Sequence, residues 1–286
     1  MMSEMKPELD IKYQRLLQAL AEMGSAVIAL SGGVDSALLA QAAHQALGER
    51  AVAMTADSPS MPRRELDEAR HLARQIGMRH VVFKSHEMED PRYTANPVDR
   101  CYFCKQETFS EMEQQARQLG YTTICYGENI DDNSDHRPGA NAAREFGVRS
   151  PLKEAGLGKA EIRQLAQRFG LPVWDKPAAA CLSSRFPYGS VITVEKLAQV
   201  EEAEDFLWEL GFHQYRVRHH GDIARIEAAE AEMSRLLVQA PAIVERLRQL
   251  GFTYITIDLA GYRRGSLNEP AQAAGLIPLA ALDEGL

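Results

Sequence analysis

The sequence has few cysteines and no long apolar run. Four cysteines in 286 residues do not make the disulfide framework of a small secreted scaffold, and a chain of this length can bury a core without such staples. The longest apolar runs, 26–30 and 277–282, are far shorter than the roughly 18 residues that a membrane span needs. The first residues mix charges and lack the apolar segment of a signal peptide. These absences predict a cytoplasmic protein with reduced thiols and no membrane partner.

Basic residues are also in short supply. The chain has 32 Lys and Arg against 40 Asp and Glu, which gives a formal net charge of −8. This balance argues against a protein that holds nucleic acid through its overall field, although it is compatible with a local basic patch. With 45% hydrophobic residues, 20 glycines and 13 prolines, the composition excludes fibrous and low-complexity chains. At roughly 150 residues per domain, the length predicts two domains.

Strand-like and helical patterns alternate through the first half of the chain. Short apolar runs typical of strands buried on both faces occur at 25–30, 51–56, 80–84 and 122–126. Segments with helical spacing of apolar residues occur at 9–23, 36–47, 62–76 and 103–119. This alternation predicts right-handed βαβ units and an α/β fold with a parallel sheet covered on both faces. Ligands of such sheets bind beyond the carboxyl ends of the strands.

The pattern changes after about residue 176. A long acidic helix is predicted over 193–210, followed by a hairpin that turns at Gly221 and Asp222. A further helix over 239–250 and a strand over 253–258 complete a smaller α+β unit. We place the domain boundary so that the first domain spans 1–180 and the second spans 181–286.

The strongest local motif lies between the first predicted strand and the helix that follows it. It consists of Ser31, Gly32, Gly33, Val34, Asp35 and Ser36. Glycines let the backbone approach an anion closely, and the N–H groups at a helix start favour phosphate. Asp35 suits such a site if Mg²⁺ binds there too. The motif is neither a Walker A loop nor GxGxxG. A plain glycine-rich turn is the alternative, but the strand–turn–helix context favours a phosphate loop.

This hexapeptide resembles the pyrophosphate loop of the PP-loop ATPases (the N-type ATP pyrophosphatases), which split ATP into AMP and pyrophosphate. Three more segments narrow the resemblance: YGENIDDNSDHRPG at 126–139, CLSSRFPYGSVIT at 181–193 and RVRHHGDIARIE at 216–227. From about residue 10 to about residue 270, the chain resembles the LarE family of ATP-dependent sulfur transferases. The resemblance implies a PP-loop domain of Rossmann-like (adenine nucleotide alpha hydrolase-like) fold with a smaller second domain.

LarE proteins convert pyridinium-3,5-biscarboxylic acid mononucleotide into its thiocarboxylic form, a precursor of the nickel-pincer nucleotide cofactor of lactate racemase. The resemblance implies that ATP and Mg²⁺ adenylylate a substrate carboxylate and that sulfur then displaces AMP. It assigns ATP binding to residues 31–36, Asp57 and Gly127, with Asp35 also catalytic. It further implies a homo-oligomer, whereas the sulfide donor is not identified by the sequence.

The cysteines distinguish two sulfur chemistries. In one type of LarE a single cysteine, matched here by Cys181, donates its own sulfur and becomes dehydroalanine. In the other type three cysteines hold a [4Fe–4S] cluster whose open iron carries sulfide. Cys101 and Cys104, three apart at the start of a predicted helix, together with Cys181 favour the cluster, because a sacrificial mechanism leaves the pair unexplained. A zinc site, a redox dithiol and a sacrificial Cys181 are the alternatives. Cys125, in an apolar strand, is expected to be a packing residue.

The substrate that the resemblance implies is an anion with a phosphate and two carboxylates, so its site needs cations. The resemblance implies substrate contacts from Ser184, Arg185, Arg216 and Arg218. The latter two arginines are two apart on a predicted strand and therefore share one face. Arginine forks match the geometry of phosphate and carboxylate groups. Surface ion pairs with nearby glutamates are the alternative for each arginine.

Two acidic residues match family positions around a metal ion. These are Glu204 and Glu227, and a third acidic position of the family falls near Arg235 here, which weakens the expectation. Taken alone, Glu204 also fits a solvated helix face. His219 and His220 are adjacent on a predicted strand, so at most one of them faces the site.

Two other classes of protein fit parts of this pattern. A PP-loop tRNA thiolase also combines ATP activation with cysteines or a cluster, but the net charge of −8 and the lack of a basic module argue against it. A nucleotide-binding regulatory protein without catalysis would not need both an intact phosphate loop and three cysteines. The sequence therefore favours a sulfur transferase with a small-molecule mononucleotide substrate.

Overall fold

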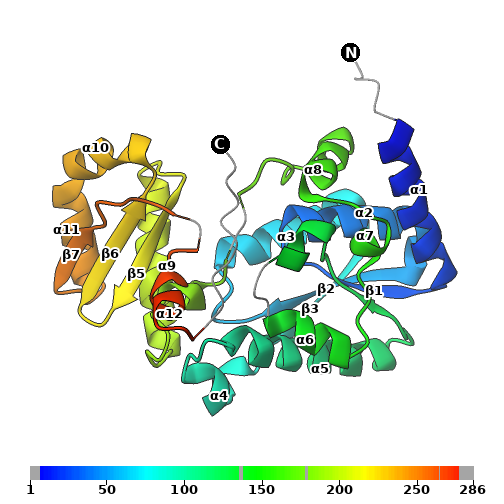
Figure 1. Ribbon diagram of the computed structural model, residues 1–286, viewed down its shortest axis with the longest axis horizontal. Helices are drawn as coiled ribbons and strands as arrows, with labels where there is room; N and C mark the ends of the chain where they lie inside the picture. Colours follow the sequence, from blue (N-terminus) through cyan, green and yellow to red (C-terminus); the bar gives the residue numbers. More distant parts are fainter. Residues whose placement is uncertain (1–6, 135–137, 178–179, 264, 277–286) are drawn as a thin grey trace. The chain divides into compact units, whose positions relative to one another are not determined.

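The chain folds into two compact units (Figure 1). The computed structural model describes residues 7–134, 138–177, 180–263 and 265–276. Within these ranges, the first unit contains residues up to 87 and residues 101–177, and the second contains residues 88–100 and those from 180 onward. The segment 88–100 thus belongs to the second unit although it lies early in the chain. No helix in the described ranges is long and apolar enough to cross a membrane.

The first unit is built on a parallel sheet with the order β3-β2-β1-β4. Its strands are β1 (Ala26–Ala29), β2 (Ala51–Asp57), β3 (Arg79–Lys84) and β4 (Ile124–Cys125). Val27 of β1 pairs with Val52 on one side and with Ile124 on the other, so β1 is central. The short apolar runs of the sequence therefore form the sheet as predicted, and the α/β fold class is confirmed.

Helices cover both faces of this sheet (Figure 1). They are α1 (Pro7–Glu22), α2 (Val34–Leu47), α3 (Arg63–Ile76), α5 (Arg100–Gln118), α6 (Pro138–Glu145), α7 (Pro151–Glu154) and α8 (Lys159–Arg168). Ala26 and Ile28 pack with α1, α2, α3, α7 and α8, whereas Val27 packs with Phe109 of α5 and Ala142 of α6. Because successive residues of a strand point to opposite faces, alternate apolar residues of β1 fill two different cores.

The second unit has a three-stranded sheet with the order β5-β6-β7. Its strands are β5 (Tyr215–His220), β6 (Ile223–Ala228) and β7 (Tyr254–Ile257). The pair β5 and β6 forms the predicted antiparallel hairpin, while β7 joins β6 in parallel. The remaining elements are α4 (Pro91–Thr94), a 3-10 turn called η4 (Leu182–Arg185), α9 (Val194–Glu209), α10 (Glu230–Val238), α11 (Ala240–Gln249) and α12 (Glu269–Ala273).

The two faces of this small sheet have different chemistry. Alternate residues such as Val217 and Ile226 are buried in a core with residues of α9, α10 and α11. The residues between them, Arg216 and Arg218 on β5 and Glu227 on β6, point to the opposite face. The register places Arg216 opposite Glu227, so charged side chains of both strands meet there. The period of two in the sequence thus separates an apolar face of the sheet from a charged face.

Candidate functional site

The hexapeptide 31–36 forms the turn from the central strand β1 into helix α2. Gly33 precedes the first helical residue, and no side chain caps the helix start. The Ser36 hydroxyl donates to the Gly33 carbonyl at 3.0 Å and accepts from the backbone N–H of Ser31 at 3.2 Å. Gly32 has φ +79°, and a Cβ there would lie 3.1 Å from the Glu65 carbonyl oxygen. The loop is therefore shaped by backbone and hydroxyl groups and presents helix N–H groups to an anion.

A second strand-end loop packs directly on this turn. A Cβ at Gly127 would lie 2.8 Å from the backbone nitrogen of Ser36 and 3.0 Å from the carbonyl carbon of Asp35, so only glycine fits. Asn129 is 2% exposed, and its amide donates to Asp35 Oδ1 at 3.3 Å. The structure thus brings Asp35 and Gly127, which are 92 positions apart by their numbers, to one place in the first unit.

Lys159 is a charged residue beside the phosphate loop that was not predicted from the sequence. Its ammonium forms an ion pair with Asp35 Oδ2. Its backbone N–H donates to Asp131 Oδ2 at 2.6 Å, and Glu161 caps the start of α8 through the Gly158 N–H at 3.0 Å. These bonds fix the first turn of α8 beside the phosphate loop. The signal in the sequence is a Gly-Lys pair ahead of a helix with a glutamate three residues after the glycine.

Asp57, the other expected ATP ligand, is the last residue of β2. Its carboxylate forms an ion pair with Arg63 at the start of α3. Because β2 neighbours β1 in the sheet, Asp57 lies at the carboxyl edge that the phosphate loop also uses. The first unit therefore carries its expected ATP residues on loops at one edge of the sheet.

The cysteines differ in exposure. Cys101 is exposed and Cys104 half-buried, both in the first turns of α5, and Cys181 is half-buried directly before η4. Cys125 is fully buried in β4, and burial raises the pKa of its thiol to about 12. Its thiolate is therefore scarce near neutral pH, as expected of a packing residue.

Cys101 and Cys104 belong to the first unit and Cys181 to the second. Among the described residues, no group of three or more His, Cys, Asp or Glu side chains has a metal-binding arrangement. The donor chemistry of the three accessible thiols nevertheless fits an iron–sulfur cluster, because thiolate sulfur is the ligand that such clusters take. Cys104 Sγ also lies 3.9 Å from Oε2 of the buried Glu87.

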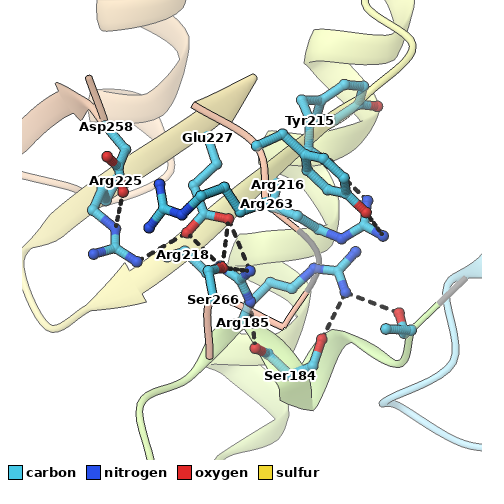
Figure 2. Close-up of polar contacts among 12 residues, drawn as sticks. Ser184, Arg185, Tyr215, Arg216, Arg218, Arg225, Glu227, Asp258, Arg263 and Ser266 are labelled. Atoms are coloured by element: carbon cyan, nitrogen blue, oxygen red, sulfur yellow. Dashed lines mark hydrogen bonds and ion pairs between the residues drawn. The ribbon is translucent and has the colours of Figure 1, made fainter. Parts of the chain in front are cut away.

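A network of arginines and carboxylates occupies the charged face of the second unit (Figure 2). Arg185 is 3% exposed and binds Glu204 through two bonds, Nε to Oε1 at 2.9 Å and Nη2 to Oε2 at 2.8 Å. Its third nitrogen donates to the Ser184 hydroxyl at 2.8 Å and to the Cys181 carbonyl at 3.2 Å. Burial alone would raise the pKa of Glu204, but the guanidinium of Arg185 lowers it overall. Arg185 therefore ties the loop of Cys181 to helix α9.

A second buried carboxylate holds the next arginines. Glu227 is fully buried and accepts from Arg218 at 2.8 Å and from Arg225 at 2.9 Å (Figure 2). Arg218 also donates to the Ser184 carbonyl at 2.7 Å and to the Ser266 hydroxyl at 2.8 Å. Ser266 in turn lies within 3.2 Å of Glu227 Oε2. Arg218 is thereby fixed from three sides.

Arg216 is the arginine of this network whose hydrogen bonds, among the described residues, go to neutral acceptors alone. It donates to the Tyr215 carbonyl at 2.7 Å and lies 5.2 Å from the ring centre of Tyr262. Burial and the nearby charges of Arg185 and Arg218 lower the pKa of its guanidinium. In addition, Nε of Arg218 is buried without a hydrogen-bond partner in the described part of the chain. The face therefore has a surplus of cationic donors, which an anionic ligand would satisfy.

The two carboxylates expected near a metal, Glu204 and Glu227, both accept hydrogen bonds from arginines. Each oxygen of Glu204 and of Glu227 accepts from a guanidinium group. At the third position, Arg235 donates to the Gly211 carbonyl at 3.0 Å and lies 4.9 Å from the Phe212 ring centre, at the end of α9. This donor set fits an anchor for arginines better than a divalent metal site.

The two histidines face opposite ways, as the strand pattern predicts. His219 stacks on Phe186 at 5.0 Å, and its Nε2 lies 3.0 Å from the accepting oxygen Oε1 of Gln199. His220 lies on the side of the arginines, and Arg225 and Arg218 are among the causes that lower its pKa, after burial. Only His220 is therefore placed to face a ligand of the arginine network.

The parallel sheet and its strand-end phosphate loop define a PP-loop enzyme that uses ATP. The family described as NAD synthase matches residues 11–127. The chain is 37% identical over 273 residues to the pyridinium-3,5-bisthiocarboxylic acid mononucleotide synthase of Lactiplantibacillus plantarum. The aligned region covers 95% of this chain and 99% of that protein. It is 48% identical over 262 residues to an uncharacterized protein of Synechocystis, with 91% and 98% covered. A glutamine-hydrolyzing GMP synthase of Methanosphaerula palustris has a subunit that is 30% identical over 156 residues, about half of each chain.

The first two relatives are similar over nearly their whole length, which includes both units. The chain belongs to the LarE family of ATP-dependent sulfurtransferases.

Proposed function

We propose that this protein adenylylates the carboxylates of pyridinium-3,5-biscarboxylic acid mononucleotide and replaces their oxygen by sulfur, as a step toward the nickel-pincer nucleotide cofactor. The name of the Lactiplantibacillus plantarum relative supports this substrate. The observation that carries the proposal is the cationic face of the second unit, where Arg216 contacts neutral acceptors and is crowded by Arg185 and Arg218. Such a face suits a ligand with a phosphate and two carboxylates.

Activation of the carboxylate is the task of the first unit. A carboxylate oxygen of the substrate attacks the α-phosphorus of ATP, pyrophosphate leaves, and an acyl-adenylate forms. The helix N–H groups after Gly33 and the hydroxyls of Ser31 and Ser36 stabilise the negative charge that builds on the pyrophosphate. Asp35 would hold Mg²⁺, which would supply positive charge that stabilises the leaving pyrophosphate. Lys159, now paired with Asp35, would then donate to the polyphosphate.

Orientation of the substrate is the task of the second unit. We assign the substrate phosphate to Ser184, Arg216 and Arg218, with Arg185 beside them. The ion pairs of Arg185 with Glu204 and of Arg218 with Glu227 set these guanidinium groups in place before the substrate arrives. A preset fork loses less side-chain entropy on binding than a mobile one. The carboxylates thus act by positioning the arginines rather than by contacting the substrate.

The sulfur is proposed to come from a site held by Cys101, Cys104 and Cys181. A [4Fe–4S] cluster bound to these three thiolates would supply one iron without a protein ligand, at which external sulfide can be carried. Sulfide attack on the acyl carbonyl expels AMP and leaves a thiocarboxylate. Two such rounds convert both carboxylates. We also propose a homo-oligomer, as in the family.

The test is anaerobic purification followed by iron and sulfide analysis, with the wild type compared with Cys101→Ala. We expect iron and sulfide in the wild type and little of either in the variant. Near-zero iron in both proteins would overturn the cluster. The intact mass after turnover gives a second result, because conversion of Cys181 to dehydroalanine would identify that residue as a sacrificial donor instead. Pyrophosphate release that depends on the mononucleotide tests the activation step separately.

A further inference from the structure

A second lysine lies beside the phosphate loop. The Lys176 ammonium donates to Glu65 Oε2 at 2.6 Å and also forms an ion pair with Glu68, and both glutamates are on helix α3. The same Oε2 lies 3.5 Å from the position that a Cβ on Gly32 would take. A single carboxylate oxygen therefore separates the ammonium from the turn at Gly32. All of these residues belong to the first unit.

The backbone around Lys176 is fixed without its ammonium group. The Arg163 guanidinium of α8 donates to the carbonyls of Trp174 and Lys176, each at 2.7 Å. Val173 is buried in the same core as residues of α2, α3 and α8. The Glu68 carboxylate is exposed, and an ion pair in such a place contributes little to stability. Stabilisation of the fold therefore does not account for the ammonium at this position.

The charges of this group do not balance without a further anion or cation. Lys176 carries one positive charge, whereas Glu65 and Glu68 carry two negative charges. The turn next to them presents helix N–H groups to an anion. Two uncompensated carboxylates beside that turn would repel a polyphosphate. A cation at position 176 is therefore needed if the loop is to hold one.

The ammonium has a donor left for such an anion. A lysine ammonium has three N–H donors. Two of them serve Glu65 and Glu68, and the third has no hydrogen-bond partner in the part of the chain that the structure describes. An anion at the loop can accept the third donor while both contacts to the glutamates remain. The glutamates then hold the ammonium in place, as Asp35 holds Lys159.

Helix α8 positions both lysines. Lys159 and Arg163 are four residues apart on this helix and therefore lie on one face of it. Lys159 pairs with Asp35 in the first turn of α2, and Arg163 binds the backbone of Lys176. The loop 31–36 thus has one ammonium group beside its second residue and another beside its fifth.

We propose that Lys176 donates to the β- and γ-phosphates of ATP at the phosphate loop and, with Lys159, stabilises the pyrophosphate as it leaves. The inference rests on the activation step of the proposed function, because it takes residues 31–36 as the polyphosphate site. In that step a carboxylate oxygen bonds to the α-phosphorus while the bond from this phosphorus to the bridging oxygen breaks. The electron pair stays on the pyrophosphate, and an ammonium that is already in place stabilises the growing charge.

The first experiment measures the binding of inorganic pyrophosphate with Mg²⁺ by isothermal titration calorimetry, with AMP as the reference ligand. We expect Lys176→Met to raise the Kd for pyrophosphate roughly 10- to 100-fold, because a hydrogen bond to a charged group is lost. The Kd for AMP, which lacks the β- and γ-phosphates, should stay within a few-fold of the wild type. An unchanged Kd for pyrophosphate, or equal losses for both ligands, would overturn the proposal.

Glu65→Gln distinguishes a donor from an anchor. It removes the carboxylate next to Gly32 but keeps the ammonium and its pair with Glu68. If Lys176 is a donor, the Kd for pyrophosphate stays the same or falls, because a negative charge has been removed. If Lys176 only anchors α3, Glu65→Gln loses as much affinity as Lys176→Met, and that result would overturn the proposal.

Lys153→Met is the control for the loss of one positive charge from the first unit. Lys153 pairs with Glu128 at 2.9 Å, and we expect its variant to bind pyrophosphate within a few-fold of the wild type. A loss as large as that of Lys176→Met would show an effect of net charge alone and would overturn the proposal.

Lys176→Gln serves if Lys176→Met does not fold, because its amide can still donate to Glu65. We expect the same loss of pyrophosphate affinity, and wild-type affinity in this variant would overturn the proposal. Failure of the proposed function gives a different result. If pyrophosphate binding depends on Lys176 but no pyrophosphate is released from ATP with the mononucleotide, the proposed substrate fails and the role of Lys176 stands. A wild type that does not bind pyrophosphate would refute that role.

Discussion

The two units present different groups that could hold an anion. The first unit presents helix N–H groups and two serine hydroxyls in a glycine-containing turn of six residues. The second unit presents guanidinium groups that pair with the buried carboxylates Glu204 and Glu227. A backbone site tolerates no added bulk, whereas a side-chain network tolerates no missing partner. Substitutions in each unit test this contrast.

The largest effect is expected from Glu227→Ala in the second unit. It leaves two arginines, Arg218 and Arg225, without their buried carboxylate. Loss of one partner of a buried pair costs about 3–5 kcal/mol. Urea unfolding followed by Trp208 fluorescence in a Trp174→Phe background reports on this unit.

The matched control is Glu269→Ala, which removes an exposed pair with Arg263. An exposed pair contributes about 0–1 kcal/mol. If the two variants lose similar stability, the carboxylate at position 227 is not an anchor of the network.

The next effect is expected from Lys159→Met in the first unit. The change removes the cation paired with Asp35, which we propose as a donor to the leaving pyrophosphate. Loss of one preorganised donor lowers kcat about 100-fold or more. Pyrophosphate release in the presence of the mononucleotide is the assay.

Lys153→Met is the control for this variant. Lys153 also forms an ion pair, with Glu128 at 2.9 Å. Among the described residues, its ammonium group has no hydrogen bond to the phosphate loop. We expect its kcat to stay within a few-fold of the wild type. Similar losses in both variants would mean that Lys159 acts through folding.

A smaller effect is expected from Gly127→Ala. The new methyl group would meet the backbone of Asp35 and Ser36 at 3.0 and 2.8 Å. Overpacking of this kind typically costs about 1–3 kcal/mol because the neighbouring backbone must shift. Since the backbone that shifts is that of the phosphate loop, we expect KM for ATP to rise roughly tenfold. We expect little change in KM for the mononucleotide. A change confined to the mononucleotide would show that the loop at Gly127 does not support the phosphate loop.

The smallest effect concerns pH. Burial and then Lys196 lower the pKa of His219 below its ordinary value of 6.5. The unfolded chain therefore binds more protons than the folded one, and stability is present above about pH 6.5 and lost as the pH falls through the folded pKa. For one proton, the free energy of unfolding changes by at most about 1.4 kcal/mol per pH unit.

We expect His219→Gln to flatten this dependence in the second unit, with the Trp208 fluorescence as the readout. His71→Gln is the control, because His71 is an exposed residue of the first unit. An unchanged slope in His219→Gln would contradict the assigned cause.

The contrast also explains what could be predicted from the sequence. The parallel sheet, the phosphate loop and the 214–228 hairpin follow from apolar periodicity and turn residues that are neighbours in the chain. The ion pair of Lys159 with Asp35 and the hydrogen bond of Arg100 to the Ser183 carbonyl could not be predicted in this way, because the two partners of each lie far apart in the sequence. Lys159 is 124 positions from Asp35, and Arg100 is 83 positions from Ser183.

Burial was the second quantity that the sequence left open. Glu204 lies in an acidic helix segment that fits a solvated face, yet it is 7% exposed and paired with Arg185. Glu204 is buried because α9 packs against β5, where Val217 donates its backbone N–H to the Glu204 carboxylate. Only the folded sheet reveals that this carboxylate belongs to the arginine network.

The central claim is that ATP activates a carboxylate for attack by sulfur. The most direct measurement uses a mononucleotide labelled with oxygen-18 in its carboxylates, incubated anaerobically with the protein, ATP and sulfide. The account predicts that one labelled oxygen appears in AMP for each sulfur atom found in the product. Sulfur incorporation with unlabelled AMP, or labelled AMP without any thiocarboxylate, would contradict it.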